Sequence, residues 1–261
     1  MPSEKQSRIP KHQNLWLAKD LTFQRSSGIS TGYENLDSFL PDSGWPKSGL
    51  VEIECESVGV GELRLLVPVL RQFSESRNQW ITWINSPCIP YAPGLHSLGI
   101  DIQKILLIHT KKDKDTLWAL EKSCRSKSCS AVLVWLNHPI KFKESQRLQM
   151  AAKAGGNLIY LFRLSRQQSH SSASELKLNL RHTEESGVIN IDILKRRRGW
   201  AVHDVKLNVA QIIDTSKKQI QDIREKLQLW RGTKGNPSSE HDSAQIEELT
   251  DTTTRRFDKD L

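Results

Sequence analysis

Short apolar runs alternate with longer amphipathic segments along most of this 261-residue chain. The short runs are rich in β-branched and aromatic residues, which favour strands. They lie at residues 50–53, 80–84, 105–108, 130–136 and 157–162. Segments with apolar positions at helical spacing predict helices at residues 62–73, 95–98, 116–123 and 146–154. Repeated strand–helix units predict an α/β fold, with a parallel sheet covered by helices on both faces.

Three segments predict how this sheet is built. Residues 130–136 are apolar throughout, which is typical of a central strand buried on both sides. Residues 176–180 and 188–194 instead alternate between apolar and polar positions. This alternation predicts a pair of antiparallel strands after the parallel part.

Two of the predicted helices contain residues that affect their start or their regularity. Residues 30–40 predict a short helix, which Ser30 or Thr31 could cap. The helix at 62–73 contains Pro68, which lacks a backbone N–H and is expected to kink or loosen it.

The two ends of the chain are more polar than its centre. The predicted organisation is an N-terminal arm at 1–27, an α/β domain at 28–209, an amphipathic helix at 210–230 and a polar, disordered tail at 231–261. The apolar seam of the helix includes Ile220, Ile223, Leu227 and Trp230. This seam could pack on the protein's own body or bind a partner, and we expect a partner site there.

Residues 51–66 have the layout of a phosphate-binding loop, with an apolar strand, a turn containing glycines and then an apolar helix. A working loop of this kind needs a lysine for the β- and γ-phosphates, followed by Ser or Thr for magnesium. Glu62 and Leu63 stand at those two places. A carboxylate repels polyphosphate and leucine cannot bind a metal, so the loop lacks the chemistry of a nucleoside triphosphatase.

Other residues of the loop also indicate that it lacks the chemistry of a nucleoside triphosphatase. Glu56 replaces the first glycine of the motif and adds a second negative charge. Gly59 and Gly61 are the candidates for any remaining nucleotide contact. We interpret them as turn glycines of an inherited scaffold. The sequence therefore predicts no catalytic residues, no metal site and no cofactor, with ATP and magnesium as an unlikely alternative.

The formal charge of +8 and the isoelectric point near 9.3 raise the possibility of nucleic-acid binding. Residues 231–261 carry five Lys/Arg and seven Asp/Glu, so the rest of the chain is still more basic. Solubility explains such a charge equally well. No apolar run is long enough to span a membrane, and the first residues lack the apolar core of a signal peptide. Four scattered cysteines, with no zinc-site spacing, agree with a cytoplasmic protein.

The densest positive charge lies at Lys195, Arg196, Arg197 and Arg198, followed closely by Trp200. Adjacent cations suit phosphates, and an exposed tryptophan can stack on a base of single-stranded nucleic acid. A solvated turn, or a surface for an acidic partner, is an equally valid interpretation. The run is therefore a candidate DNA site with two alternatives.

Several segments together resemble the ImuA family, RecA-like accessory proteins of bacterial mutagenic translesion synthesis that are related to the division inhibitor SulA. The segments that resemble ImuA are 40–41, 44–46, 58–68, 90–93, 118–121 and 131–136. Residues 30–32, 99–101 and 104–106 resemble the core of RecA-type recombinases. The most specific are Gly61–Leu66 and Tyr91–Pro93, and the resemblance covers about residues 28–200. It implies a RecA-like P-loop core whose nucleotide motifs are degenerate.

Compared with a working recombinase, two further positions have lost their carboxylate. The fourth strand is followed by Asn137 where a magnesium-binding aspartate is expected, and Asn85 stands near the place of the glutamate that activates water. With Glu62 and Leu63, these losses make ATP turnover improbable.

The resemblance implies a non-catalytic scaffold of the SOS response to DNA damage, acting in translesion synthesis and SOS mutagenesis. Its implied partners are an ImuB-like homologue of Y-family polymerases, RecA and an error-prone DnaE-type polymerase, with single-stranded DNA as a possible further contact. It implies a bacterial, cytoplasmic protein that joins the nucleoid after damage. Two alternatives are a SulA-like inhibitor of the division protein FtsZ and a DNA-dependent ATPase with an atypical site.

Overall fold

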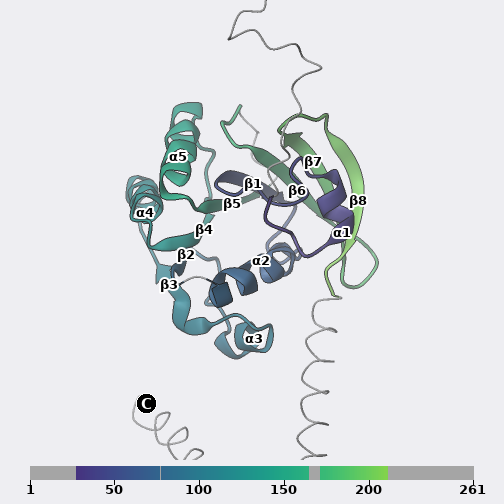
Figure 1. Cartoon of the computed structure of the whole chain (residues 1–261), viewed down its shortest axis with the longest axis horizontal. Coiled ribbons are helices and arrows are strands. Elements are labelled where there is room, and N and C mark those ends of the chain that lie inside the picture. Colours follow the sequence, from purple (N-terminus) through teal and green to yellow (C-terminus); the bar gives the residue numbers. More distant parts are fainter. Residues whose placement is uncertain (1–27, 77, 165–170, 211–261) are drawn as a thin grey trace, which may run out of the picture. The chain divides into compact units, whose positions relative to one another are not determined.

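The computed structural model describes residues 28–76, 78–164 and 171–210. The predicted arm, the C-terminal amphipathic helix with Ile220, Ile223, Leu227 and Trp230, and the polar tail lie outside these residues. Within them, the fold is a mixed α/β domain (Figure 1). None of its helices combines the length and the apolar character that crossing a bilayer requires, as far as the described residues extend.

A single eight-stranded sheet organises the described residues, in the order β3-β2-β4-β5-β1-β6-β7-β8. The strands are β1 (Gly49–Cys55), β2 (Trp80–Ile84), β3 (Ile105–Ile108), β4 (Cys129–Trp135), β5 (Leu158–Leu164), β6 (Leu176–His182), β7 (Val188–Arg196) and β8 (Val202–Asn208). The first six are parallel, whereas β7 and β8 continue the sheet as antiparallel strands. The predicted parallel sheet and antiparallel pair are therefore confirmed.

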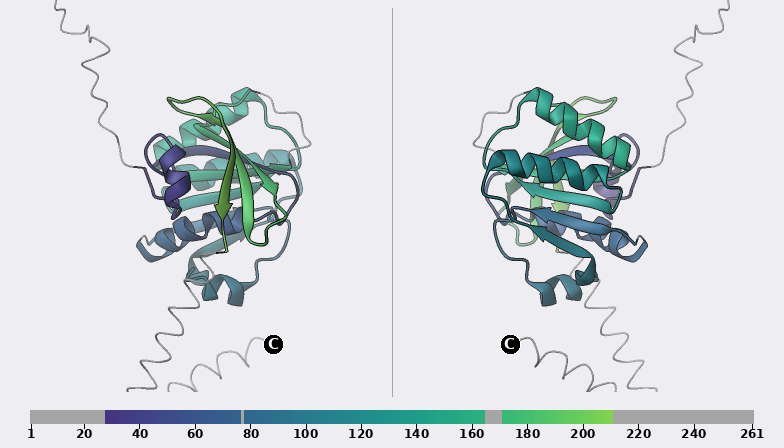
Figure 2. Two further views of the ribbon diagram at one scale, coloured as in Figure 1. Left: turned by 90° about the vertical axis from the view of Figure 1, so that its right-hand side faces the viewer. Right: turned by 90° about the vertical axis from the view of Figure 1, so that its left-hand side faces the viewer.

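Helices lie on both faces of the parallel part, as predicted (Figures 1 and 2). They are α1 (Glu34–Phe39), α2 (Glu62–Ser76), α3 (Ala92–Ser97), the 3₁₀ turn η1 (Ile102–Lys104), α4 (Asp113–Arg125) and α5 (Phe142–Gly155). One apolar core lies between α2 and the sheet, and a second lies between the opposite face and the pair α4 and α5. Strand β4 is buried along nearly all of its length, as predicted for a central strand.

Some local predictions were wrong. Strand β8 was not predicted, because its alternation is weak: His203 and Asp204 follow one another and Asp204 has a positive φ of 59°. Ser30 and Thr31 do not cap α1, whose N-cap is Tyr33. They lie upstream of the first turn, where the Ser30 hydroxyl and the Thr31 N–H both donate to the Asp37 carboxylate, at 2.7 and 2.9 Å.

Pro68 lies inside α2, and the helix continues beyond it to Ser76 instead of ending near residue 73. Its ring packs against the turn at Gly32, which has a φ of +82°. A Cβ at Gly32 would lie 2.4 Å from the Cβ of Pro68, so only glycine fits this contact. Pro68 thus helps to attach the segment before α1 to the body of the domain.

Candidate functional site

The loop between β1 and α2 is closed by one of its own side chains. The backbone N–H groups of Gly59 and Gly61 donate to the two carboxylate oxygens of Glu62, at 3.0 and 3.1 Å. Glu62 is only 6% exposed and is the first residue of α2. N–H groups of such a loop, at the start of a helix, are the donors that bind phosphate in a P-loop. Here the Glu62 carboxylate already accepts from them.

Both glycines are required by the backbone of this loop. Gly59 and Gly61 have φ angles of +86° and +118°, which side chains with a Cβ rarely adopt. A Cβ on Gly61 would also lie 3.0 Å from a methyl carbon of Ile189. The two predicted nucleotide-site residues therefore lie together in the loop, where their N–H groups bind Glu62.

Aromatic rings fill much of the space beside this loop. Trp135 stacks on Phe162 with ring centroids 4.8 Å apart, and Trp83 lies 5.7 Å from Trp135. The cavity that remains measures about 110 Å³. It is lined by Cys55, Val58, Glu62, Asn85, Pro87, Trp135, Leu136, Asn137, Phe162, Arg163 and Leu164. Typical ligand pockets are about 300–1,000 Å³, so this cavity is smaller than a typical ligand pocket.

Asn85, which stands near the predicted position of a catalytic glutamate, has a structural role instead. Its side-chain amide donates to the hydroxyls of Thr110 and Thr116, and its carbonyl accepts from the Thr110 N–H at 2.8 Å. Asn85 therefore joins the end of β2 to the loop before α4 and to α4 itself. Its positive φ of 53° is a conformation that asparagine tolerates better than most residues.

Cys55, at the end of β1, borders the same small cavity. Burial, and to a smaller extent the carboxylates of Glu62 and Glu54, raises the pKa of the Cys55 thiol. The thiol therefore stays protonated at neutral pH and is a poor nucleophile.

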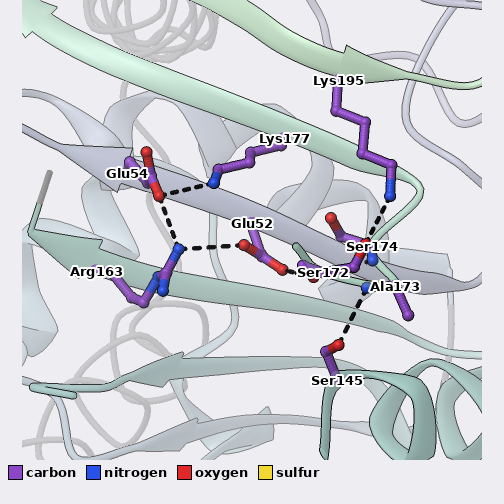
Figure 3. Close-up of polar contacts among 9 residues, drawn as sticks. All are labelled: Glu52, Glu54, Ser145, Arg163, Ser172, Ala173, Ser174, Lys177 and Lys195. Atoms are coloured by element: carbon purple, nitrogen blue, oxygen red, sulfur yellow. Dashed lines mark hydrogen bonds and ion pairs between the residues drawn. The ribbon is translucent and has the colours of Figure 1, made fainter. Parts of the chain in front are cut away.

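A cluster of buried charges joins β1 to its neighbours β5 and β6 (Figure 3). Arg163 on β5 contacts Glu54 at 2.7 Å and Glu52 at 3.3 Å, and Lys177 on β6 contacts Glu54 at 3.0 Å. Fewer than one tenth of each residue's surface is exposed. The Ser172 hydroxyl also donates to Glu52, which attaches the segment before β6 to this cluster. Two acids and two bases balance, so the cluster is formally neutral.

This cluster was not predicted from the sequence. The signal was present, because Glu52 and Glu54 alternate with apolar residues within a strand and Arg163 interrupts the apolar run of another. Charges on a buried strand are expected to be paired. What the sequence could not indicate was which strands become neighbours, and therefore which partners they find.

The basic run forms the tip of the β7–β8 hairpin, where Arg198 has a positive φ of 57° and Arg196 is bridged to Gly199. The Lys195 ammonium donates to the Ser172 carbonyl at 2.8 Å. The guanidinium of Arg196 donates to the carbonyls of Trp200 and Phe39.

Arg197, also in this run, lies 3.8 Å from Glu175. Lys195, Arg196 and Arg197 thus contact other parts of the protein. The candidate DNA residues are brought together at this hairpin tip, and Trp200 is 90% exposed.

The same hairpin carries a charged cluster around Asp192. Its carboxylate accepts from the Arg181 guanidinium at 3.1 Å, from the Asp204 N–H at 3.0 Å and from Asn179 at 3.4 Å. Burial alone would raise the pKa of Asp192, but these bonds outweigh burial and hold its pKa below the usual range. The charged form of Asp192 therefore stabilises the folded hairpin.

Replacing Asp192 with asparagine should destabilise the protein by about 1–3 kcal/mol at pH 7, because a hydrogen-bonded charge is lost. The folded pKa lies below the unfolded value of about 3.9. The contribution is therefore complete above the unfolded pKa and disappears as the pH falls through the folded pKa. Urea unfolding of wild type and Asp192→Asn at pH 7 and pH 2.5 tests this, and an equal difference at both pH values would contradict it.

Comparisons with known proteins bear on these features. A family model described as "Cell division inhibitor SulA" matches residues 51–159, from β1 to the start of β5. The cell division inhibitor SulA of Edwardsiella piscicida is 31% identical over 118 residues, which span 43% of this chain and 67% of that protein. The chain belongs to the SulA family. The matched region contains the closed loop, Trp83 and Trp135 of the aromatic stack, and helices α2, α4 and α5.

Other relatives place the chain within a wider SulA/ImuA group. The SulA of Pectobacterium carotovorum is 29% identical, and the chain spans 58% of its length. Protein ImuA of Caulobacter vibrioides is 23% identical over 140 residues, which span 52% of this chain and 57% of that protein. A solved structure of SulA from Pseudomonas aeruginosa is 27% identical, with a TM-score of 0.37 over 44% of this chain and 98% of that one. The resemblance to the ImuA/SulA-related group is thus confirmed at the level of the group.

Proposed function

We propose that this chain is a SulA-type inhibitor of cell division that acts by binding the division protein FtsZ during the response to DNA damage. The match of residues 51–159 to the family of SulA division inhibitors carries this proposal. Relatives named as SulA reach higher identity than those named as ImuA, 31% against 23%. This function had been the alternative in the sequence analysis, and the family match now favours it.

The site geometry supports a protein that binds rather than catalyses. The loop N–H groups that would hold a phosphate donate to Glu62, and Asn85 is engaged with Thr110 and Thr116. Within the residues that line the small cavity, Glu62 is the only carboxylate. No group there is suited to activate water or to bind magnesium.

We also infer that the domain descends from a RecA-like P-loop core. Strand β1, the glycine loop and α2 form the strand–loop–helix unit of that fold, and β1 lies between two parallel neighbours in the sheet. The carboxylate in the loop is what distinguishes this chain from an active member. Fold alone does not fix function, so the functional argument rests on the closed site.

A second candidate function is that of an ImuA-like scaffold in translesion synthesis. The Caulobacter ImuA match favours it, because it spans more of this chain than the Edwardsiella SulA match does, 52% against 43%. Strands β6 to β8 and the basic hairpin tip also lie beyond the SulA family match. The partners would then be the ImuB-like subunit, RecA and the DnaE-type polymerase, and Lys195 to Trp200 could contact single-stranded DNA.

Expressing the full chain in a rod-shaped bacterium should produce filaments several cell lengths long, because division stops when FtsZ is bound. The purified chain should also lower the GTPase activity and the sedimentation of FtsZ in proportion to its concentration. Cell length, GTPase rate and pelleted FtsZ are the measurements. The control is the same chain expressed in cells whose FtsZ resists SulA.

The two candidate functions predict opposite results in a second assay. An ImuA-like scaffold should restore damage-induced mutation in a strain that lacks its own ImuA, with no effect on cell length. Restored mutagenesis without filaments would reject the SulA-type function and favour the scaffold.

A further inference from the structure

A groove lies between α4 and α5, and it is larger than the cavity beside the glycine loop. It measures about 450 Å³, whereas the cavity beside the glycine loop measures about 110 Å³. Its lining residues are Asp113, Lys114, Leu117, Trp118, Glu121, His138, Pro139, Lys141, Glu144, Arg147 and Leu148. Pockets of this size hold drug-sized ligands or several side chains of a peptide. The groove lies within the region that matches the SulA family.

Apolar groups line the groove below a charged rim. Leu117 and Leu148 come from the two helices, and Pro139 comes from the loop before α5. Trp118 adds a large aromatic surface that is 63% exposed, with the Lys122 ammonium 5.8 Å from the ring centroid. A tryptophan beside an apolar groove is a typical anchor of a protein interface.

The acids of the rim already have partners. Asp113 lies 3.2 Å from His138, and Glu121 is paired with both Arg125 and Arg147. Glu144 accepts from the backbone N–H of Lys141 at 2.8 Å, in the first turn of α5. Each rim carboxylate is thus engaged within the protein.

Two lysines of the rim, Lys114 and Lys141, differ from the rim acids in their ion pairing. No ion pair joins the ammonium of Lys114 or Lys141 to an acid in residues 28–76, 78–164 and 171–210. These two cations come from the two sides of the groove, Lys114 from α4 and Lys141 from the position before α5. A ligand with carboxylates at its edges and an apolar centre would complement both the charge and the lining.

We propose that this groove docks an acidic peptide segment of a partner protein, with a bulky apolar side chain against Trp118 and carboxylates near Lys114 and Lys141. Nucleic acid fits less well, because the apolar lining of Leu117, Pro139 and Leu148 offers no partner to a phosphate backbone, whereas it suits an apolar side chain. This proposal rests on the proposed function in one respect, which is that the chain acts by binding another protein. It does not depend on which protein that is.

Selection from a phage library of random 12-residue peptides against the full chain tests this directly. The enriched peptides should be acidic and should contain Phe, Trp or Leu anchors. The best peptide, labelled with fluorescein, is then titrated by anisotropy. Trp118→Ala should weaken its binding about 30-fold, as truncation of an aromatic hot spot does. The double variant Lys114→Glu/Lys141→Glu should weaken it about tenfold or more.

Matched controls separate the groove from general surface effects. Trp200→Ala removes an even more exposed tryptophan outside the groove, and Lys111→Glu reverses an exposed lysine near α4 that does not line it. Both should bind the peptide within twofold of wild type, and all variants should melt as wild type does. Enrichment of basic peptides, or full binding by Trp118→Ala, would overturn the proposal. So would binding of a labelled 20-nucleotide strand that is lost in the groove variants while no peptide is enriched.

The filamentation assay distinguishes a failure of this proposal from a failure of the proposed function. If wild type blocks division and Trp118→Ala does not, the groove is the surface that meets FtsZ. If the selected peptide binds the groove but wild type never blocks division, the SulA-type function fails and the docking groove stands. If no peptide is enriched while wild type still blocks division, the groove proposal fails alone.

Discussion

Arg163→Ala should be among the most destabilising single substitutions in this protein, with a loss of about 3–5 kcal/mol. Among the contacts in Figure 3, the change leaves buried Glu54 with Lys177 as its cationic partner and leaves buried Glu52 with only the Ser172 hydroxyl. A buried carboxylate without a partner loses its hydration and gains nothing in return. Because a domain is stable by only about 5–15 kcal/mol, the variant should be close to unfolding. Urea unfolding followed by circular dichroism measures the effect.

Two controls separate burial from charge. Arg125→Ala breaks an ion pair with Glu121 in which the arginine side chain is 62% exposed, and it should cost no more than about 1 kcal/mol. The fourfold variant Glu52→Met/Glu54→Met/Arg163→Met/Lys177→Met removes all the charges together. It should fold at least nearly as stably as wild type, because apolar replacement of a whole buried network is often neutral or stabilising. If Arg163→Ala unfolds at the same urea concentration as wild type, the cluster contributes little.

The chain's hydrophobic pattern was sufficient to predict strands β1 to β7 of the sheet, because these strands are rich in apolar residues and most are separated by amphipathic helices. Strands β2 and β3 were both predicted with their observed bounds. Helix ends were less accurate. Helix α5 begins at Phe142, four residues before its predicted start at residue 146, since its first turn is polar and Glu144 binds the N-cap backbone. Patterns of burial do not report such local hydrogen bonds.

The geometry of the candidate site could not be predicted from the sequence. The sequence indicated only that Glu62 stands where a P-loop would carry its lysine. The sequence suggested that its charge would repel a phosphate from outside. In the structure, the carboxylate instead accepts from the loop's own N–H groups, which a linear pattern cannot indicate. The α4–α5 groove was not predicted either, because the exposure of Trp118 depends on how the two helices pack.

The basic run at residues 195–198 illustrates a different limit of predicting a binding surface from the sequence. Four adjacent cations look like one phosphate-binding patch in the sequence, but a tight hairpin turn points successive side chains in different directions. Lys195 and Arg196 donate to backbone carbonyls of other segments, and Arg197 lies near Glu175. Charge density along a chain therefore overestimates the charge that a surface offers. A DNA contact at this hairpin tip remains a prediction that depends mainly on Trp200.

Glu62→Ala should convert the closed loop into an open anion site. The N–H groups of Gly59 and Gly61 lose their acceptor, and hydrogen bonds to a charged group contribute about 1.5–3 kcal/mol each. We therefore expect the variant to be destabilised by about 2 kcal/mol, since water partly replaces the carboxylate. Inorganic phosphate should then bind the free N–H groups and restore part of that stability. At ten times its dissociation constant, a ligand stabilises the folded state by about 1.4 kcal/mol.

Thermal unfolding of wild type and variant, in chloride and in phosphate at matched ionic strength, measures this exchange. Phosphate stabilises many proteins generally, so the relevant quantity is the extra gain of the variant over wild type. Glu56→Ala is the matched control, because Glu56 is an exposed acid of the same loop and makes no bond to Gly59 or Gly61 among the contacts found. It should respond to phosphate as wild type does.

The result decides what the loop is. A phosphate gain specific to Glu62→Ala means that the anion-binding backbone of a P-loop persists and that one carboxylate closes it. ATP hydrolysis should still be absent from the variant, because Leu63 cannot bind magnesium and Asn85 remains engaged with Thr110 and Thr116. If wild type gains as much from phosphate as the variant, or hydrolyses ATP above background, then Glu62 does not close the site and the chain has kept more of its ancestral chemistry than its contacts indicate.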